Sequence, residues 1–174
     1  MNKKFFISVW AIFFYFMTLS SVLAAGETEH ILEKRTTSVT PIFMPNHVGD
    51  QNWIQGFQFE GDIFLRGKGE KIGSFSGEAL FANPPLNLAE TYEHFFMSTL
   101  NDIPGFGTFQ ETTSGLTLGS SANNGDVVLA WSGSISNGTG FFENNYGLTA
   151  GNSAFNIFTG VGIFTEVLNI RNGL

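Results

Sequence analysis

Alternation of apolar and polar residues dominates the chain after Ala25, and it predicts β-strands. The segment GFQFEGDIFL, residues 56–65, places phenylalanine, isoleucine and leucine on one face and acidic or amide side chains on the other. Residues 73–81 and 125–135 have the same period of two. The apolar faces comprise Phe57, Phe59, Ile63, Leu65, Phe75, Ala79, Phe81, Val127, Leu129, Trp131 and Ile135. We expect these faces to line the interior of one sheet.

Residues 153–170, SAFNIFTGVGIFTEVLNI, are interpreted as one more strand, with apolar residues on both faces. One face carries Phe155, Ile157, Val161, Ile163 and Val167, and the other carries Phe158, Phe164 and Leu168. Such a strand is covered on both sides, and contact with a partner chain would provide the second cover.

Three weaker strands are predicted at residues 29–39, 90–100 and 107–118. Residues 86–97 fit a short helix equally well, because Leu88, Tyr92 and Phe95 have a helical spacing. No other stretch beyond Ala25 has a convincing helical period, which predicts an all-β domain.

Turn-forming residues separate the predicted strands. Residues 66–73 have the composition of a hairpin loop, and Asn124 followed by Gly125 is a favoured pair for a tight hairpin. Residues 82–87, ANPPLN, are excluded from a central strand because proline has no N–H to donate.

Seven or eight strands with short connections form an antiparallel sheet whose edges must be protected. Closure into a barrel protects them, as does a sandwich. Glycines within the predicted strands favour the barrel, because they permit the bends and bulges that closure requires. These glycines are Gly61, Gly77, Gly133, Gly160 and Gly162.

Residues 1–25 form a segment of a different kind. Two lysines precede an almost wholly apolar run from Phe5 to Leu19, and mostly small residues follow up to Ala25. This pattern predicts a signal peptide, cleaved after Ala24 or Ala25, and a single β-barrel domain at residues 26–174 of a secreted or periplasmic protein. An uncleaved anchor is the alternative, since a bilayer span needs roughly 20 residues.

The charge and the amino-acid composition exclude several kinds of binding partner and catalytic site. The chain has 8 basic and 15 acidic residues, so its net charge is -7. An acidic surface repels phosphate groups, so neither nucleic acid nor anionic lipid is expected as a partner. No second apolar segment approaches the length of a bilayer span, so no stable membrane insertion is expected after signal removal. The absence of cysteine excludes thiol catalysis and cysteine metal sites. The 20 phenylalanines indicate a wide apolar interior, either a filled core or a pocket.

The segment SNGTGFFENNYG, residues 136–147, combines glycines with two adjacent phenylalanines. It predicts a tight connection between two strands, in which glycines take positive φ and one phenylalanine faces inward. Its GTGFFENNYG part resembles the signature of the allene oxide cyclase and dirigent family of β-barrels, a Gly-Ser/Thr-Gly followed by an apolar residue, Phe and a later glycine. The matching positions are Gly138, Thr139, Gly140, Phe142 and Gly147.

This resemblance implies a single antiparallel eight-stranded barrel of the calycin type with an apolar cavity, and it makes a homotrimer possible, since many members of the family are trimers. Glu143 and Tyr146 look closer to the cyclase branch than to the dirigent branch. The cyclase site uses a carboxylate and a polar group that holds a water. Glu29 and Glu33 lie on the first predicted strand, where that carboxylate could sit, but their flanking residues do not match the family. The paired aspartates of dirigent proteins have no evident counterpart, and the signature is structural, so catalysis does not follow from it.

Few residues suggest other chemistry. The three histidines, His30, His47 and His94, are widely spaced and form no metal motif, so no metal or cofactor is expected. The carboxylates of Glu60, Asp62 and Glu78 lie opposite the apolar strand faces and are solvated if those faces are the barrel interior. A carboxylate inside the barrel would be the natural general base, because burial raises its pKa.

These observations favour a secreted barrel that binds an apolar small molecule. The alternatives are a filled barrel that functions through its surface, an isomerase or cyclase-like enzyme acting on a reactive lipid, and, ranked last, a small outer-membrane barrel. The candidate wall of the ligand site comprises Phe57, Phe59, Phe75, Phe81, Trp131 and Phe142.

Overall fold

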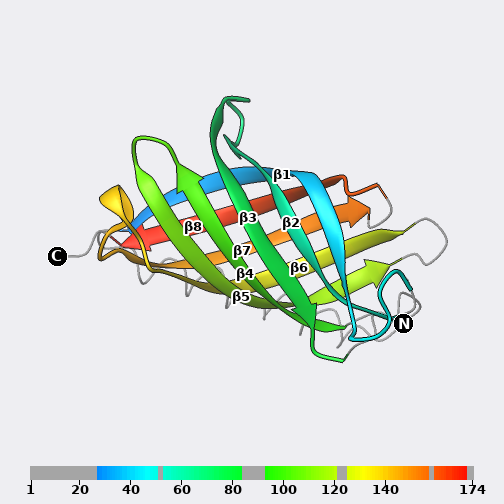
Figure 1. Cartoon of the computed structure of the whole chain (residues 1–174). Coiled ribbons are helices and arrows are strands. Elements are labelled where there is room, and N and C mark those ends of the chain that lie inside the picture. The colour runs from blue at the N-terminus through cyan, green and yellow to red at the C-terminus, as the bar shows by residue number, and fades with distance from the viewer. Residues whose placement is uncertain (1–26, 51–52, 84–92, 121–124, 157–158, 172–174) are drawn as a thin grey trace, which may run out of the picture.

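The computed structural model describes residues 27–50, 53–83, 93–120, 125–156 and 159–171, which form a closed barrel of eight antiparallel strands (Figure 1). The strands are β1 (Glu27–Phe43), β2 (Ile54–Leu65), β3 (Lys71–Phe81), β4 (His94–Ile103), β5 (Gly107–Ser120), β6 (Asp126–Ser136), β7 (Tyr146–Asn156) and β8 (Gly162–Arg171), with a 3-10 turn, η2 (Gly140–Phe142), between β6 and β7. The predicted fold class is confirmed.

Each strand pairs with the next along the chain, and β8 pairs with β1 to close the barrel. Figure 1 shows this closure, with β1 in blue beside β8 in red. Register shifts interrupt the ladder within β1, between Thr36 and Ser38, and within β5, between Thr117 and Gly119. Irregularities of this kind increase local twist, which a small barrel needs in order to close. Because the described strands form a closed ring, both edges of each strand are paired.

Alternate residues of the strands point into the barrel, as the three strongest alternating segments predict. All eleven apolar positions named for those segments lie in the core or pack against it. Phe164 occupies the centre of an aromatic cluster, with ring centroids 5.9 Å from Phe59, 6.1 Å from Phe75 and 5.7 Å from Trp131. These separations suit favourable offset and edge contacts between rings.

Inward-facing glycines lie directly opposite large aromatic side chains. Gly61 pairs with Phe75, Gly77 with Phe59, and Gly115 with both Phe95 and Trp131. Phenylalanine rings lie across these glycines, so that a Cβ at Gly61 would meet the Phe75 ring at 2.8 Å. The glycines therefore make room for the phenylalanines inside a narrow barrel.

Replacement of Gly115 by alanine is expected to destabilise the barrel by about 1–3 kcal/mol. The new Cβ would overlap the Ala130 carbonyl oxygen and lie 2.7 Å from the Phe95 ring, so the backbone or the ring must move. Chemical denaturation measures the change. Ser114→Ala is the matched control, because Ser114 is the exposed neighbour on the same strand. Equal stability of the two variants would contradict this account of the glycines.

The prediction of one long strand at residues 153–170 is wrong. The chain turns between β7 and β8, where Gly160 has φ +68 and its N–H donates to the Asn156 carbonyl. The turn breaks the alternation, so in β8 the interior face carries Phe164 and Leu168, while Val161 and Ile163 are exposed. Phe155 lies in β7, but its side chain, like residues 157 and 158, is outside the described residues.

Two other expectations have mixed outcomes. The alternative prediction of a helix at residues 86–97 is wrong for its last four residues, which begin β4. Residues 84–92 lie outside the described residues. The connection predicted at 136–147 is confirmed between β6 and β7, with Phe142 buried and Phe141 exposed. Gly140 has positive φ as expected, but Gly138 does not, and a Cβ there would overlap the Phe142 carbonyl oxygen. Glycine is therefore required at position 138 because the backbone of Phe142 lies too close for a Cβ.

Candidate functional site

An apolar pocket of about 260 Å³ opens at the end of the barrel where β1 begins and β8 ends. Its walls come from β1 to β5, from β8 and from two connections, and every lining side chain is aliphatic or aromatic. We call it the mouth pocket, lined by Leu32, Leu65, Ile72, Ile103, Phe106, Phe109, Phe141, Phe142, Leu168 and Ile170.

The segment between β6 and β7 forms one side of the rim of the mouth pocket. The Phe141 N–H donates to the Phe106 carbonyl in the β4–β5 turn, and the Thr139 and Thr108 backbones are also joined by a hydrogen bond of 2.8 Å. A Cβ on Gly140 would overlap the Phe106 carbonyl oxygen, so glycine permits this approach. Phe106 and Phe141 meet edge to face at 6.1 Å, and both are more than half exposed. Exposed aromatic side chains therefore lie at the entrance.

A buried ion cluster lies in the next layer of the barrel. The Lys34 ammonium contacts the carboxylates of Glu111 at 2.7 Å and Glu166 at 2.6 Å, and the Thr149 hydroxyl donates to Glu166 at 2.6 Å. Lys34 is on β1 and Glu111 is on β5, across the barrel, so the cluster spans the interior. Each ionic side chain is at most 4% exposed. We call Lys34, Glu111 and Glu166 the ionic triad.

The ionic triad lies beneath the mouth pocket. On its strand, each member of the ionic triad is two positions from a pocket-lining residue. Because alternate residues of a strand point to the same face, the triad member and the lining residue both lie on the inner face. Those lining residues are Leu32, Phe109 and Leu168, and all are buried. The pocket floor therefore separates an apolar compartment from a charged one.

One lysine cannot neutralise two carboxylates, and the pKa values reflect this. Burial raises the pKa of Glu111 to about 8 despite the charge of Lys34, and the charge of Glu166 and a hydrogen bond with it act in the same direction. Burial also favours a raised pKa for Glu166, but the Lys34 charge and hydrogen bonds from Glu111, Lys34 and Thr149 lower it overall. Burial alone would lower the pKa of Lys34, but the two carboxylates raise it. Near neutral pH, Glu111 therefore holds a proton while Glu166 is ionised.

The six predicted wall residues are all buried, but they lie in different parts of the barrel. Phe142 lines the mouth pocket, with its ring 4.7 Å from that of Phe109. Phe57, Phe59 and Phe81 surround a void of only about 20 Å³ at the other end of the barrel. Phe75 and Trp131 pack against Phe164. A ligand-binding role for these residues stays a prediction.

Sequence reasoning missed the ionic triad because its members lie on segments with weak alternation. The inward face of these strands is clear only once the strand registers are known. Its members then include Lys34, Glu111 and Glu166. Glu33, a candidate for the family carboxylate, lies on the neighbouring position of β1 and pairs with Arg35 at 2.6 Å. The side chain of Glu29 is outside the described residues.

The other candidate polar residues do not form a site. Glu60 and Glu78 are exposed, and Asp62 pairs with Lys71 at 2.7 Å, so the prediction that these carboxylates are solvated is confirmed. His47 stacks on Trp53 with ring centroids 4.1 Å apart, and His94 is exposed. The side chain of His30 is outside the described residues, among which no group of three metal-ligating side chains occurs.

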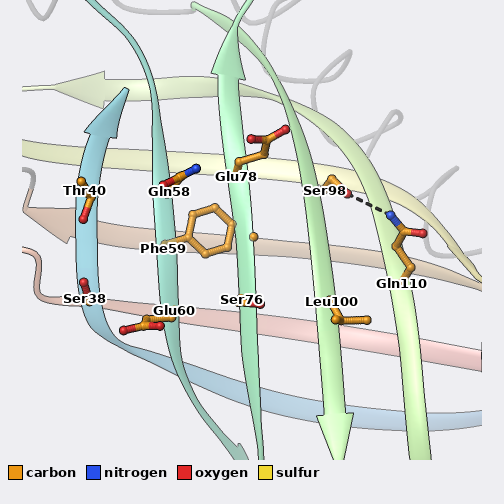
Figure 2. A pocket seen from close by; sticks show the side chains of 11 residues that line it. Ser38, Thr40, Gln58, Phe59, Glu60, Ser76, Glu78, Ser98, Leu100 and Gln110 are labelled. Atoms are coloured by element: carbon orange, nitrogen blue, oxygen red, sulfur yellow. Dashed lines mark hydrogen bonds between the residues drawn. The ribbon is translucent and has the colours of Figure 1, made fainter. Parts of the chain in front are cut away.

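A second hollow lies on the outer surface of β1 to β5. Figure 2 shows serine, threonine, glutamine and glutamate side chains there, with Gln110 donating a hydrogen bond to Ser98 at 3.2 Å. The hollow measures about 520 Å³, and the Phe59 ring forms part of its floor where Gly77 has no side chain. Glu60, Ser76 and Glu78 are exposed there. It is therefore an open, solvated polar surface, whereas the mouth pocket is an apolar compartment.

Comparisons with known proteins find similarity in structure but not in sequence. No protein-family model matches the sequence, and no curated protein matches it. A nonspecific heme-binding cyclase, which catalyses a 4 + 2 cycloaddition during neoabyssomicin biosynthesis, is similar in structure, with a TM-score of 0.49 and 16% sequence identity over 99% of this chain and 80% of that chain. At this level of similarity nothing about the present chain is inferred from it. No helix among the described residues has the length and apolar character needed to cross a membrane.

Proposed function

We propose that this protein binds an apolar small molecule in the mouth pocket. The observation that carries the proposal is the pocket wall, in which every lining side chain is hydrocarbon or aromatic. Ligand sites are typically concave and mostly apolar, and the mouths of β-barrels are a common location for them. The exposed rings of Phe106 and Phe141 provide apolar surface at the entrance.

The pocket volume limits the size of the part of the ligand that lies inside it. A space of about 260 Å³ accommodates roughly nine groups of about 30 Å³, the volume of one water molecule in the liquid. A small ring with a short chain, or a short acyl chain, has this size. Burial of such a molecule contributes roughly 25 cal/mol for each Å² of apolar surface removed from water.

Replacement of Ile72 by tryptophan is expected to abolish binding of propylbenzene, an apolar probe of suitable size. Ile72 is a half-buried lining residue, so the larger ring can enter the pocket without disrupting the fully buried core. Titration calorimetry should show binding to the wild-type protein and at least tenfold weaker binding to the variant. Ile163→Trp is the matched control, because Ile163 lies on the outer face of β8. Failure of the wild-type protein to bind propylbenzene would contradict the proposed function.

A second candidate function is an isomerase or cyclase-like reaction on a bound lipid. Glu111 favours it, since a buried carboxyl that holds its proton near neutral pH is suited to acid–base catalysis, but Glu111 lies beneath the pocket floor, so this function requires the ligand to pass that floor. Glu111→Gln would then abolish turnover of a lipid ligand while preserving its binding, and unchanged turnover would exclude this role for Glu111.

We further propose that the protein is exported and that it assembles as a homotrimer. The apolar run at Phe5 to Leu19 supports export by a cleaved signal peptide, and the family resemblance supports a homotrimer. N-terminal sequencing of the protein from its own host tests the cleavage, and a mature chain that begins at Met1 would contradict it.

A further inference from the structure

Asn101 is a buried polar residue that the barrel itself does not satisfy. It lies on the inner face of β4, its exposed fraction is 0%, and neither its Oδ1 nor its Nδ2 atom has a hydrogen-bond partner among the described residues. Buried amide groups without partners are unfavourable, and nearly all buried polar groups in native proteins are paired. An apolar side chain of similar shape at this position would avoid the cost.

The position of Asn101 connects it to the mouth pocket. Ile103, two residues nearer the entrance on the same face of β4, lines the pocket, and Asn101 pairs in register with Phe109, which also lines it. Thr113, Trp131 and Ser153 also bury an unpaired polar atom, but they lie deeper in the barrel, and Glu111 Oε1, which is unpaired as well, belongs to the ionic triad. Asn101 therefore offers an unpaired amide directly beneath a pocket whose lining side chains carry no hydrogen-bonding group.

The surrounding charges restrict what Asn101 can bind. The nearest buried ionic layer contains two carboxyl groups, Glu111 on β5 and Glu166 on β8, for the single ammonium of Lys34 on β1. With Glu111 protonated, the single ammonium of Lys34 is already balanced by Glu166, so no free cation is left to pair with an anionic group, and burial of an unpaired anion is costly. An amide both donates and accepts hydrogen bonds, and so does a hydroxyl group.

We infer that Asn101 recognises the polar end of the ligand, and that the ligand is an uncharged apolar alcohol bound with its hydroxyl pointing into the barrel. This inference rests on the proposed function of the mouth pocket. Asn101 does not itself line the mouth pocket, so the proposal requires the half-buried side chain of Ile103 to turn aside for the hydroxyl to reach the amide. The alcohol donates to Oδ1 and accepts from Nδ2, while its hydrocarbon part fills the pocket.

The test compares 3-phenylpropan-1-ol with propylbenzene, which lacks the hydroxyl. Asn101→Leu keeps the side-chain shape and removes the amide. We expect the alcohol to bind the variant roughly thirtyfold more weakly than wild type, the loss of two hydrogen bonds of about 1 kcal/mol net each, and propylbenzene to bind both equally. The variant without ligand is expected to be at least as stable as wild type, because two unpaired buried atoms are removed. Asn152→Leu, on the exposed face of β7, is the control.

Each outcome separates this inference from the proposed function. An equal loss of affinity for both probes, or no loss for either, would overturn the role of Asn101. A wild-type protein that binds neither probe would contradict ligand binding in the mouth pocket.

A measurement on the wild-type protein alone keeps the inference testable if Asn101→Leu does not fold. The alcohol should bind at least tenfold more tightly than 3-phenylpropanoate, and equal affinity would show that the polar end points to solvent.

Discussion

Replacement of Lys34 by methionine is expected to destabilise the barrel by about 3–5 kcal/mol near neutral pH. The substitution removes the cation that contacts both Glu111 and Glu166 and leaves two carboxyl groups buried side by side. Transfer of charged groups into such an interior is costly unless they are paired. Equilibrium unfolding in urea measures the effect.

Lys71→Met is the matched control for this experiment. Lys71 also pairs with a carboxylate at 2.7 Å, that of Asp62, but its side chain is 56% exposed. Exposed pairs contribute roughly 0–1 kcal/mol because water and salt screen them. A loss of stability in Lys34→Met no larger than that in Lys71→Met would show that the ionic triad is unimportant to the fold.

Stability of the wild-type barrel is expected to fall by a few kcal/mol as the pH rises from about 4.5 to about 8. The pKa of Glu111 is about 8 in the folded protein, against an ordinary value of 4.5, so over this interval the folded state retains a proton that the unfolded state releases. Each unit of pKa difference corresponds to about 1.4 kcal/mol. The other two members of the ionic triad act outside this interval. Glu166, with its lowered pKa, loses its contribution below pH 4.5, and Lys34, with its raised pKa, loses its contribution above pH 10.5.

Glu111→Gln isolates the residue responsible for the pH dependence. The amide keeps the shape of the protonated carboxyl and does not titrate, so the decline in the free energy of unfolding between about pH 5 and pH 8 should disappear. Glu60→Gln is the control, since Glu60 is exposed on the outer face of β2. A decline that persists in Glu111→Gln, or one that Glu60→Gln removes, would assign the titration to another group.

The barrel was predictable from sequence because its strongest signals are local. Alternation over residues 56–65, 73–81 and 125–135 identifies which side chains are buried, and glycines within strands indicate bending. The error at residues 153–170 has a physical cause. Apolar residues occur on both sides of the turn, and Gly160 and Gly162, interpreted as glycines within one strand, instead lie in the turn and at the first residue of β8.

The polar interior was not predictable in the same way. Lys34, Glu111 and Glu166 lie on three strands that are far apart in the chain, and only the closure of β1 against β8 and the width of the barrel bring them together. Asn101 illustrates the same limit, because its lack of partners is a property of the folded interior and not of its neighbours in sequence. The mouth pocket likewise depends on how the β6–β7 connection docks on the β4–β5 turn.

Native mass spectrometry of the protein, purified from its own host without detergent, tests the central proposal most directly. The wild-type protein should carry a discrete additional mass of at least about 100 Da, as a pocket with room for roughly nine heavy-atom groups implies, and Ile72→Trp should lack it. An additional mass carried equally by both proteins, or by neither, would contradict binding in the mouth pocket.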